Sequence, residues 1–176
     1  VMKKLISIII PMYNEEESLP YLYDRLTKLS DKIENYNMEF LFVNDGSKDN
    51  SLNIVKAYKK SDERVCYLNL SRNFGKEVAM AAALDYVRGD VVAIIDADLQ
   101  DPPELIIDML KYYEEGYDDV YAKRKSRKGE TVLKKFTSHT FYRVLRSVSK
   151  VPIQEDTGDF RLLSRRAVEA LKAFPE

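Results

Sequence analysis

The chain has 176 residues and a formal net charge of −1, with 28 Lys and Arg against 29 Asp and Glu. This length suits one globular domain with a buried core, and the balanced charge gives no electrostatic reason to expect a nucleic-acid partner. The single cysteine excludes a disulfide framework, and no apolar run reaches the roughly 20 residues that a membrane-spanning helix needs.

Strand-like and helix-like patterns alternate along the chain as far as Ala122. Short apolar runs predict strands at 5–10, 38–43, 65–70, 91–95 and 119–122. Apolar residues at helical spacing predict a helix between each pair of strands, the first over about 15–36 with an acidic first turn. This alternation predicts an α/β domain with a mostly parallel sheet and helices on both faces.

The fourth predicted strand ends in Asp96 and Asp98. In an extended segment these two carboxylates point to the same side, beyond the edge at which open α/β sheets bind their ligands. Two hard oxygen ligands aimed at one point suit Mg²⁺ or Mn²⁺, with phosphate oxygens and water completing the coordination. The alternative is that both aspartates are solvated turn residues and that Asp101 caps the following helix.

The character of the sequence changes after Ala122. Residues 123–128 are strongly basic, and within 132–150 apolar residues share a run with lysines and arginines. This composition predicts a basic amphipathic helix, which is typical of a membrane-surface element. A core-packed helix with a solvated basic face is the alternative. Further along, Ser164 can cap a short last helix.

Four motifs occur in order, at 11–15 (Pro-Met-Tyr-Asn-Glu), 44–47 (Asn-Asp-Gly-Ser), 96–98 (Asp-Ala-Asp) and 158–161 (Gly-Asp-Phe-Arg). Together they make the chain resemble a family 2 glycosyltransferase of the GT-A (Rossmann-like) fold. More narrowly, the run Asp-Ala-Asp-Leu-Gln-Asp-Pro-Pro is characteristic of the polyprenyl-phosphate glycosyltransferases, which include dolichol-phosphate mannosyltransferase and undecaprenyl-phosphate glucosyltransferases. A dinucleotide-binding Rossmann domain is disfavoured, because the first strand does not lead to a Gly-x-Gly-x-x-Gly turn.

The resemblance implies a nucleotide-sugar site at these motifs. Asp98, with the help of Asp96, would hold a Mg²⁺ or Mn²⁺ ion that bridges the donor diphosphate. Asp45 would accept a hydrogen bond from a base N–H, a role that is compatible with a turn-forming aspartate. The other residues that the resemblance places around the nucleotide are Pro11, Tyr13, Asn14, Glu15, Ala97 and Gln100.

The acceptor side is implied in the same way. Arg124 would neutralise a donor or acceptor phosphate, and Asp159 or Asp156 would be the general base. The positions that would meet the lipid phosphate are Lys134 and Ser138. A lipid phosphate is already an anion and needs a base less than a hydroxyl acceptor does, so the role of Asp159 stays open. Its structural alternative is a surface ion pair with Arg161, which would share its face of a strand.

The implied reaction is the inverting transfer of a sugar from a nucleotide-diphosphate sugar, with uridine favoured over guanosine, to a polyprenyl phosphate at the cytoplasmic face of a membrane. The segment 123–150 would bind the anionic lipid surface, and a homo-oligomer is compatible with this arrangement. Relatives usually continue with amphipathic helices and often two membrane spans. We therefore expect residues 1–176 to be a single GT-A domain that precedes a membrane-associated region. Two alternatives stay open: a family 2 transferase with a saccharide or protein acceptor, and a nucleotide-sugar-binding module without turnover.

Overall fold

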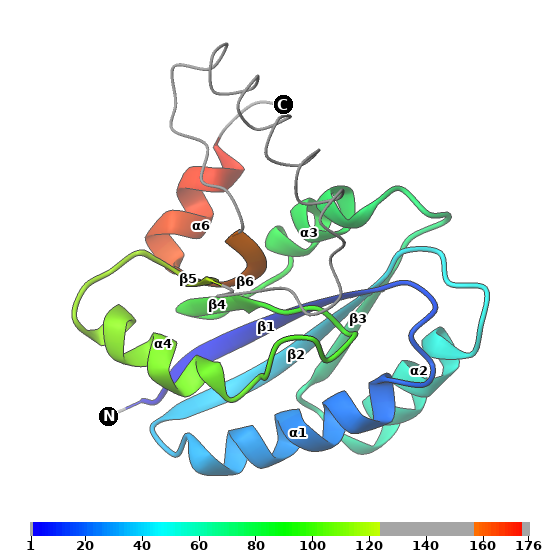
Figure 1. The fold of residues 1–176 in the computed structure, drawn as a ribbon, viewed down its shortest axis with the longest axis horizontal. Coiled ribbons are helices and arrows are strands. Elements are labelled where there is room, and N and C mark those ends of the chain that lie inside the picture. Colours follow the sequence, from blue (N-terminus) through cyan, green and yellow to red (C-terminus); the bar gives the residue numbers. More distant parts are fainter. Residues whose placement is uncertain (1, 124–156, 174–176) are drawn as a thin grey trace, which may run out of the picture. The chain divides into compact units, whose positions relative to one another are not determined.

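The computed structural model describes residues 2–123 and 157–173 (Figure 1). The chain divides into two compact units, residues 1–121 with 159–176, and residues 122–158. The centre of the sheet and the candidate site lie in the first unit. The basic helix expected after residue 131 falls outside the described residues, so it stays a prediction.

The described strands form one sheet in the order β3-β2-β1-β4-β6-β5. Their bounds are β1 (Lys4–Met12), β2 (Tyr36–Asn44), β3 (Val65–Asn69), β4 (Val91–Ile94), β5 (Asp119–Lys123) and β6 (Thr157–Ser164). β1 pairs in parallel with β2 and with β4, and β2 pairs in parallel with β3. β6 runs antiparallel to β4, with Ala93 opposite Leu162. The mostly parallel sheet is therefore confirmed, and β6 adds an antiparallel strand between β4 and β5.

The described helices cover both faces of this sheet, as predicted (Figure 1). Their bounds are α1 (Leu19–Lys32), α2 (Ser51–Ser61), α3 (Lys76–Leu84), α4 (Leu105–Glu114) and α6 (Arg165–Lys172). α3 and α6 contact each other on one face. On the other face α1 lies between α2 and α4: Tyr23 stacks on Tyr58 with ring centroids 4.0 Å apart, and Arg25 Nε donates to Glu104 at 3.0 Å. As predicted, the Ser164 hydroxyl caps α6.

The first helix begins later than predicted. α1 starts at Leu19, so the acidic residues 15–17 precede the helix. Asn14 has a left-handed φ of 54°, and Glu15 N donates to the Ser51 hydroxyl at 2.8 Å. The expected acidic first turn is therefore wrong, because these contacts tie the segment to the start of α2 at the edge of the sheet.

The central strands are buried on both faces. Ile8 and Ile9 of β1 point to opposite sides of the sheet, as do neighbouring residues of β2 such as Leu41 and Phe42, and none of the four is more than 4% exposed. Helices on both faces leave no solvated side for polar residues to occupy. The strands therefore read as continuous apolar runs, which is why those runs locate them in the sequence.

An ionic network around the buried carboxylate of Glu39, here named the Glu39 network, lies at the N-terminal side of β4, and its Arg88 side chain is exposed. Glu39 is 5% exposed and accepts hydrogen bonds from Ser7 Oγ at 2.5 Å and from the Arg88 guanidinium at 2.6 and 3.0 Å. The Ser7 hydroxyl accepts from Gly89 N at 2.7 Å, and Arg165 Nε donates to the Gly89 carbonyl at 2.9 Å. Burial alone would raise the pKa of Glu39, but the hydrogen bonds from Ser7 and Arg88 outweigh burial and lower that pKa. The network thereby joins β1, β2, α6 and the segment before β4.

Candidate functional site

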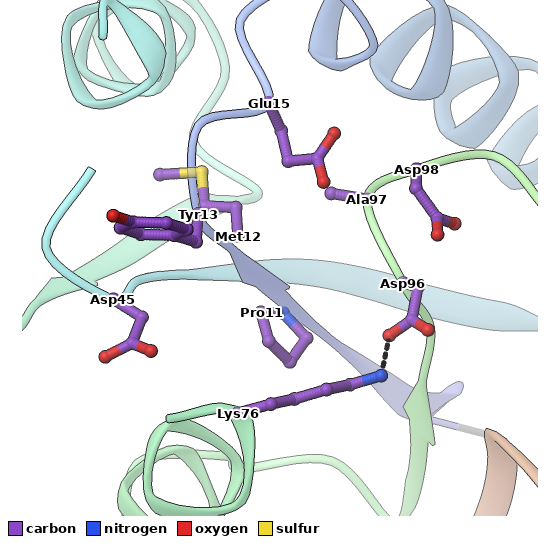
Figure 2. Close-up of a pocket in the computed structure, with 9 residues that line it drawn as sticks. All are labelled: Pro11, Met12, Tyr13, Glu15, Asp45, Lys76, Asp96, Ala97 and Asp98. Atoms are coloured by element: carbon purple, nitrogen blue, oxygen red, sulfur yellow. Dashed lines mark ion pairs between the residues drawn. The ribbon is translucent and has the colours of Figure 1, made fainter. Parts of the chain in front are cut away.

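A pocket opens at the C-terminal ends of β1 and β4 (Figure 2). β2 and β3 lie on one side of β1 and β4 lies on the other, and open α/β sheets bind ligands at such a switch point. The residues that line the pocket are Pro11, Met12, Tyr13, Glu15, Asp45, Lys76, Asp96, Ala97 and Asp98. All but Met12 and Lys76 are residues that the sequence predicts around a nucleotide or a metal ion.

Asp96 and Asp98 enter this pocket from the end of β4. Ile95 N donates to a β1 carbonyl at 3.0 Å, so the extended pairing continues up to the first carboxylate. The Asp96 side chain is 23% exposed and forms an ion pair with Lys76 (Figure 2). Asp98 is exposed, and its Oδ1 accepts a hydrogen bond from Gln100 N at 3.0 Å. The predicted pair of carboxylates at one sheet edge is therefore present.

The turn that carries Asp98 holds an unfavourable backbone conformation. Leu99 has a φ of 60°, and the left-handed region costs a non-glycine residue about 1–2 kcal/mol. The hydrogen bond from Gln100 N to Asp98 spans Leu99 and closes the turn. Asp98 is thus both a turn former and a pocket residue. The alternative in which Asp101 caps the following helix is wrong on that point, because the residue that precedes α4 is Glu104.

The oxygen atoms of Asp96 and Asp98 fit a divalent cation that is shared with a ligand. Among the described residues, no group of three or more His, Cys, Asp or Glu side chains is arranged to hold a metal ion. Mg²⁺ is usually held by one or two carboxylates together with substrate phosphates and water. The pair therefore suits Mg²⁺ or Mn²⁺ that completes its coordination with a bound diphosphate, and it does not suit a metal site closed by protein ligands alone.

Glu15 adds negative charge to the pocket beside Asp96 and Asp98. Burial is the largest cause of a raised pKa at Glu15, and the nearby charges of Asp98, Asp49 and Asp96 raise this pKa further. The hydrogen bond that Ser18 Oγ donates to Glu15 at 2.8 Å opposes the shift without cancelling it. Like charges that meet in one pocket are relieved by a bound cation, so the electrostatics favour a positively charged ligand component.

Asp45 fixes the start of α3. This carboxylate is 4% exposed; its Oδ1 accepts from Phe74 N at 2.7 Å and its Oδ2 from Gly75 N at 3.0 Å. The turn after β2 is closed instead by Asn44, whose Oδ1 accepts from Ser47 N at 3.2 Å. The turn-forming role that the sequence suggests for Asp45 therefore belongs to Asn44, and the predicted contact of Asp45 with a base stays a prediction.

Lys76 is the charged pocket residue that sequence reasoning misses. It occupies the first position of α3, directly after Gly75, and its ammonium group points at Asp96 (Figure 2). A positive charge at a helix N-terminus opposes the helix dipole, and the ion pair with Asp96 offsets that cost. The sequence shows this lysine directly after Gly75, but its place at a helix N-terminus can be recognised only when the start of α3 is known.

Two predicted nucleotide contacts, Asn14 and Gln100, are not among the residues that line the pocket. The Asn14 side chain accepts a hydrogen bond from Lys48 N at 2.8 Å, and Asn14 N donates to Ser47 Oγ at 3.0 Å. Asn14 therefore joins the loops that follow β1 and β2. Gln100 is exposed on the turn after Asp98. The contacts of both residues with a nucleotide stay predictions.

The predicted acceptor residues lie mostly outside the described part of the chain. The residues in question are Arg124, Lys134, Ser138 and Asp156, together with the side chain of Asp159. The backbone of Asp159 belongs to β6, and Arg161 on the same strand forms an ion pair with Asp119 of β5 at 3.5 Å. Within residues 2–123 and 157–173, no helix is long and apolar enough to cross a membrane.

Comparison with known sequences gives a consistent picture. A model of the family described as glycosyl transferase family 2 matches residues 7–172. The chain is 48% identical over 171 residues to "uncharacterized glycosyltransferase sll0501" of Synechocystis sp., covering 97% of this chain and 54% of that protein. It is 42% identical over 171 residues to the "prophage bactoprenol glucosyl transferase homolog" of Escherichia coli K12, covering 97% of this chain and 56% of that protein. The chain thus spans about half the length of these curated relatives.

Comparison with solved structures confirms the GT-A fold. Mannosyltransferase PcManGT from Pyrobaculum calidifontis, solved in complex with GDP-Man and Mn²⁺, matches with a TM-score of 0.67 and 23% sequence identity. The match covers 99% of this chain and 48% of that one. At this identity the likeness concerns the fold alone.

Proposed function

The chain belongs to glycosyl transferase family 2, and from that premise we propose that it carries the donor site of an inverting transferase that moves a sugar from a nucleoside-diphosphate sugar to a polyprenyl phosphate. The observation that supports this proposal most is the pocket at the ends of β1 and β4, where Asp96, Asp98 and Lys76 meet. Paired carboxylates and an ammonium group are the chemistry that binds a metal–diphosphate complex.

In this proposal different residues of the pocket contact different parts of the donor. Asp96 and Asp98 hold Mg²⁺ or Mn²⁺, which supplies charge stabilisation to the leaving diphosphate. Pro11 and Tyr13 form the wall for the nucleoside, and Asp45 accepts from a base N–H. Tyr13 is 40% exposed, which leaves its ring available for stacking. Uridine is the proposed base, on the resemblance to the polyprenyl-phosphate subgroup.

The acceptor is the second part of the proposal. A relative that is 42% identical is named as a bactoprenol glucosyl transferase homolog, which supports a polyprenyl phosphate as the acceptor for this chain too. The basic composition of 123–150 suits an anionic membrane surface, on the cytoplasmic face where nucleotide sugars occur. Arg124, Lys134 and Ser138 are the proposed contacts to the acceptor phosphate.

The acceptor chemistry limits what a carboxylate must do. A phosphate oxygen is ionised near neutral pH, so the attacking group needs orientation more than deprotonation. Asp159, or Asp156 in its place, is therefore proposed to orient the acceptor or to act as the base. Replacing Asp159 by Asn in a protein extended to the length of its relatives separates these roles, because loss of a base lowers turnover by about 10²–10⁴-fold.

A donor panel tests the proposed function directly. The folded chain is heated with UDP, GDP and TDP sugars, each with and without Mn²⁺. Ligand at about 100 times its dissociation constant adds about 2.7 kcal/mol to the free energy of unfolding, which is visible as a shift in melting temperature. We expect a UDP sugar to stabilise the protein only with the metal. Absence of stabilisation by every donor would contradict the proposal.

Transfer of a labelled sugar then identifies the acceptor. The extended protein is incubated with the preferred donor and either undecaprenyl phosphate in vesicles, a soluble saccharide or an acceptor protein. Labelled lipid is the expected product. Labelled saccharide or protein would replace the proposed acceptor, and donor binding without any product would indicate a nucleotide-sugar-binding module.

A further inference from the structure

Lys76 faces the carboxylates of the pocket, and the sequence alone predicts no role for it. Among the nine described residues that line the pocket, it is the basic one. Its ammonium group pairs with Asp96 Oδ1, and the two side chains are 31% and 23% exposed (Figure 2). The ammonium group therefore contacts one of the two carboxylates that fit a divalent cation.

The backbone holds Lys76 in this position. The Asp45 side chain accepts hydrogen bonds from Phe74 N and Gly75 N, which directly precede Lys76, at 2.7 and 3.0 Å. The loop before them packs closely on Gly46, since a Cβ on that glycine would lie 2.5 Å from the Arg72 carbonyl carbon and from Asn73 N. The start of α3 is thereby fixed to the end of β2, and the lysine stem reaches Asp96 from a defined point.

The placement is electrostatically unfavourable unless an anion is opposite. A lysine in the first turn of α3 meets the positive end of the helix dipole, and its pairing with Asp96 offsets that cost. A divalent cation that binds Asp96 competes with this ammonium group for the carboxylate. A cation that arrives with a nucleoside diphosphate brings negative charge that can accept the displaced ammonium group.

We propose that Lys76 is an exchangeable counter-ion of Asp96. Lys76 neutralises Asp96 when no donor is bound; when a metal–diphosphate binds, it releases Asp96 to the cation and its ammonium group contacts the diphosphate. The flexible four-carbon stem of lysine permits this exchange without movement of α3. The inference rests on the proposed donor site and deepens it: the pocket selects the metal–nucleotide complex over the free metal ion.

Binding of Mn²⁺ alone tests the exchange without any turnover. The concentration of free Mn²⁺ is measured by electron paramagnetic resonance during titration of the wild type and of Lys76→Met. This substitution keeps a long unbranched side chain of similar helix propensity but removes its charge. We expect Lys76→Met to bind bare Mn²⁺ about fivefold more tightly, the ratio that corresponds to ~1 kcal/mol for a partly exposed ion pair. Unchanged or weaker Mn²⁺ binding in this variant would overturn the proposal.

Two control variants make the comparison specific. Lys76→Arg keeps the charge and is expected to bind bare Mn²⁺ like the wild type. Lys111→Met removes a lysine from α4 that pairs with Asp108, with both side chains more than 60% exposed. Lys111→Met is also expected to match the wild type, and tighter Mn²⁺ binding in it would show that net charge alone explains the effect and overturn the proposal.

UDP binding in the presence of Mn²⁺ tests the second half of the exchange. We expect Lys76→Met to bind UDP about tenfold more weakly than the wild type, because a charge-assisted contact to the diphosphate is lost. Equal UDP affinity of Lys76→Met and the wild type would contradict the proposed contact between Lys76 and the diphosphate. Failure of the wild type to bind any nucleoside diphosphate would contradict the proposed function instead, while the titration with bare Mn²⁺ would still decide whether Lys76 shields Asp96.

Discussion

The parallel strands begin at one edge of the sheet, here called the N-terminal edge, and end at the other, the C-terminal edge. At the N-terminal edge the Glu39 network joins unlike charges, and each carboxylate oxygen of Glu39 accepts two hydrogen bonds. At the C-terminal edge the pocket is lined by four carboxylates, those of Glu15, Asp45, Asp96 and Asp98, and by one basic side chain, Lys76, which pairs with Asp96. The same strands carry both edges, so the difference lies in the loops and helix ends that meet there. Charge at the first edge pairs within the fold, whereas charge at the second lines the proposed donor site.

The backbone follows the same division. Left-handed φ angles occur at Asn14 and Leu99, both beside the pocket, and they are the non-glycine residues with such angles in the described chain. Unfavourable conformations of this kind gather at functional sites, where surrounding structure holds them in place. The pocket edge therefore costs stability that the opposite edge and the core must supply, and the two edges should respond differently to substitution.

The largest effect on stability is expected at Gly89. A Cβ there would lie 2.6 Å from Ser7 N, Ser7 Oγ and Val91 O, and the backbone atoms cannot move aside without breaking the Glu39 network. Gly89→Ala should lower the free energy of unfolding in urea by about 3 kcal/mol. Gly116→Ala is the matched control, because a Cβ there meets nothing within 4 Å and only its φ of 103° opposes the change. The expected control loss is about 1–2 kcal/mol, and a loss at Gly89 no larger than this would contradict the account.

Acid is expected to affect the two edges in opposite directions. The folded-state pKa of Glu39 is lowered, so its contribution to stability is present above its unfolded value of 4.5 and is lost as pH falls through the folded pKa. The folded-state pKa of Glu15 is raised, so its contribution is present below 4.5 and is lost as pH rises through the folded pKa. Glutamine at either position removes the corresponding pH dependence.

Urea unfolding from about pH 7 to about pH 3 measures both effects. The deficit of Glu39→Gln relative to the wild type should shrink as the solution becomes acidic. Glu15→Gln should match or exceed the wild type near neutral pH and lose that advantage in acid. Parallel behaviour of the two variants would show that the edges do not differ in this way.

The smallest effect is expected at Leu99. Leu99→Gly removes the left-handed strain of about 1–2 kcal/mol but adds about 0.5–1 kcal/mol of chain entropy to the unfolded state. The free energy of unfolding should therefore rise by at most about 1 kcal/mol. Mn²⁺-dependent UDP binding should weaken, because the turn that holds Asp98 becomes mobile. A variant that is clearly less stable than the wild type would show that the Leu99 side chain contributes more packing than its conformation costs.

The sequence predicts the pocket better than it predicts the connections that build it. Asp96 and Asp98 follow from one buried apolar run and the rule that ligands bind beyond its end. Lys76 does not, because its position depends on hydrogen bonds that Phe74 N and Gly75 N donate to Asp45, which is distant from them in the sequence. The start of α1 is misplaced for the same reason, since contacts with the loop after β2 hold residues 15–17 out of the helix.

Long-range pairing also limits what the pattern can reveal about the sheet. β6 inserts between β4 and β5 although it follows β5 in the chain, and its local sequence gives no sign of its neighbours. Arg161 illustrates the consequence. Reasoning along one strand offers Asp159 as its ion-pair partner, which stays a prediction, and it cannot offer Asp119 of β5, which the sheet places 3.5 Å away.

One matched pair of substitutions tests the division between the edges most directly. Asp98→Asn and Glu39→Gln each replace a carboxylate by an amide of the same shape, one at each edge. Asp98→Asn should abolish the stabilisation by a UDP sugar with Mn²⁺ while the unliganded free energy of unfolding stays within about 0.5 kcal/mol of the wild type. Glu39→Gln should lower that free energy by about 2 kcal/mol and, where folded, bind UDP with wild-type affinity. Wild-type metal-dependent binding by Asp98→Asn, or loss of binding by folded Glu39→Gln, would contradict the account.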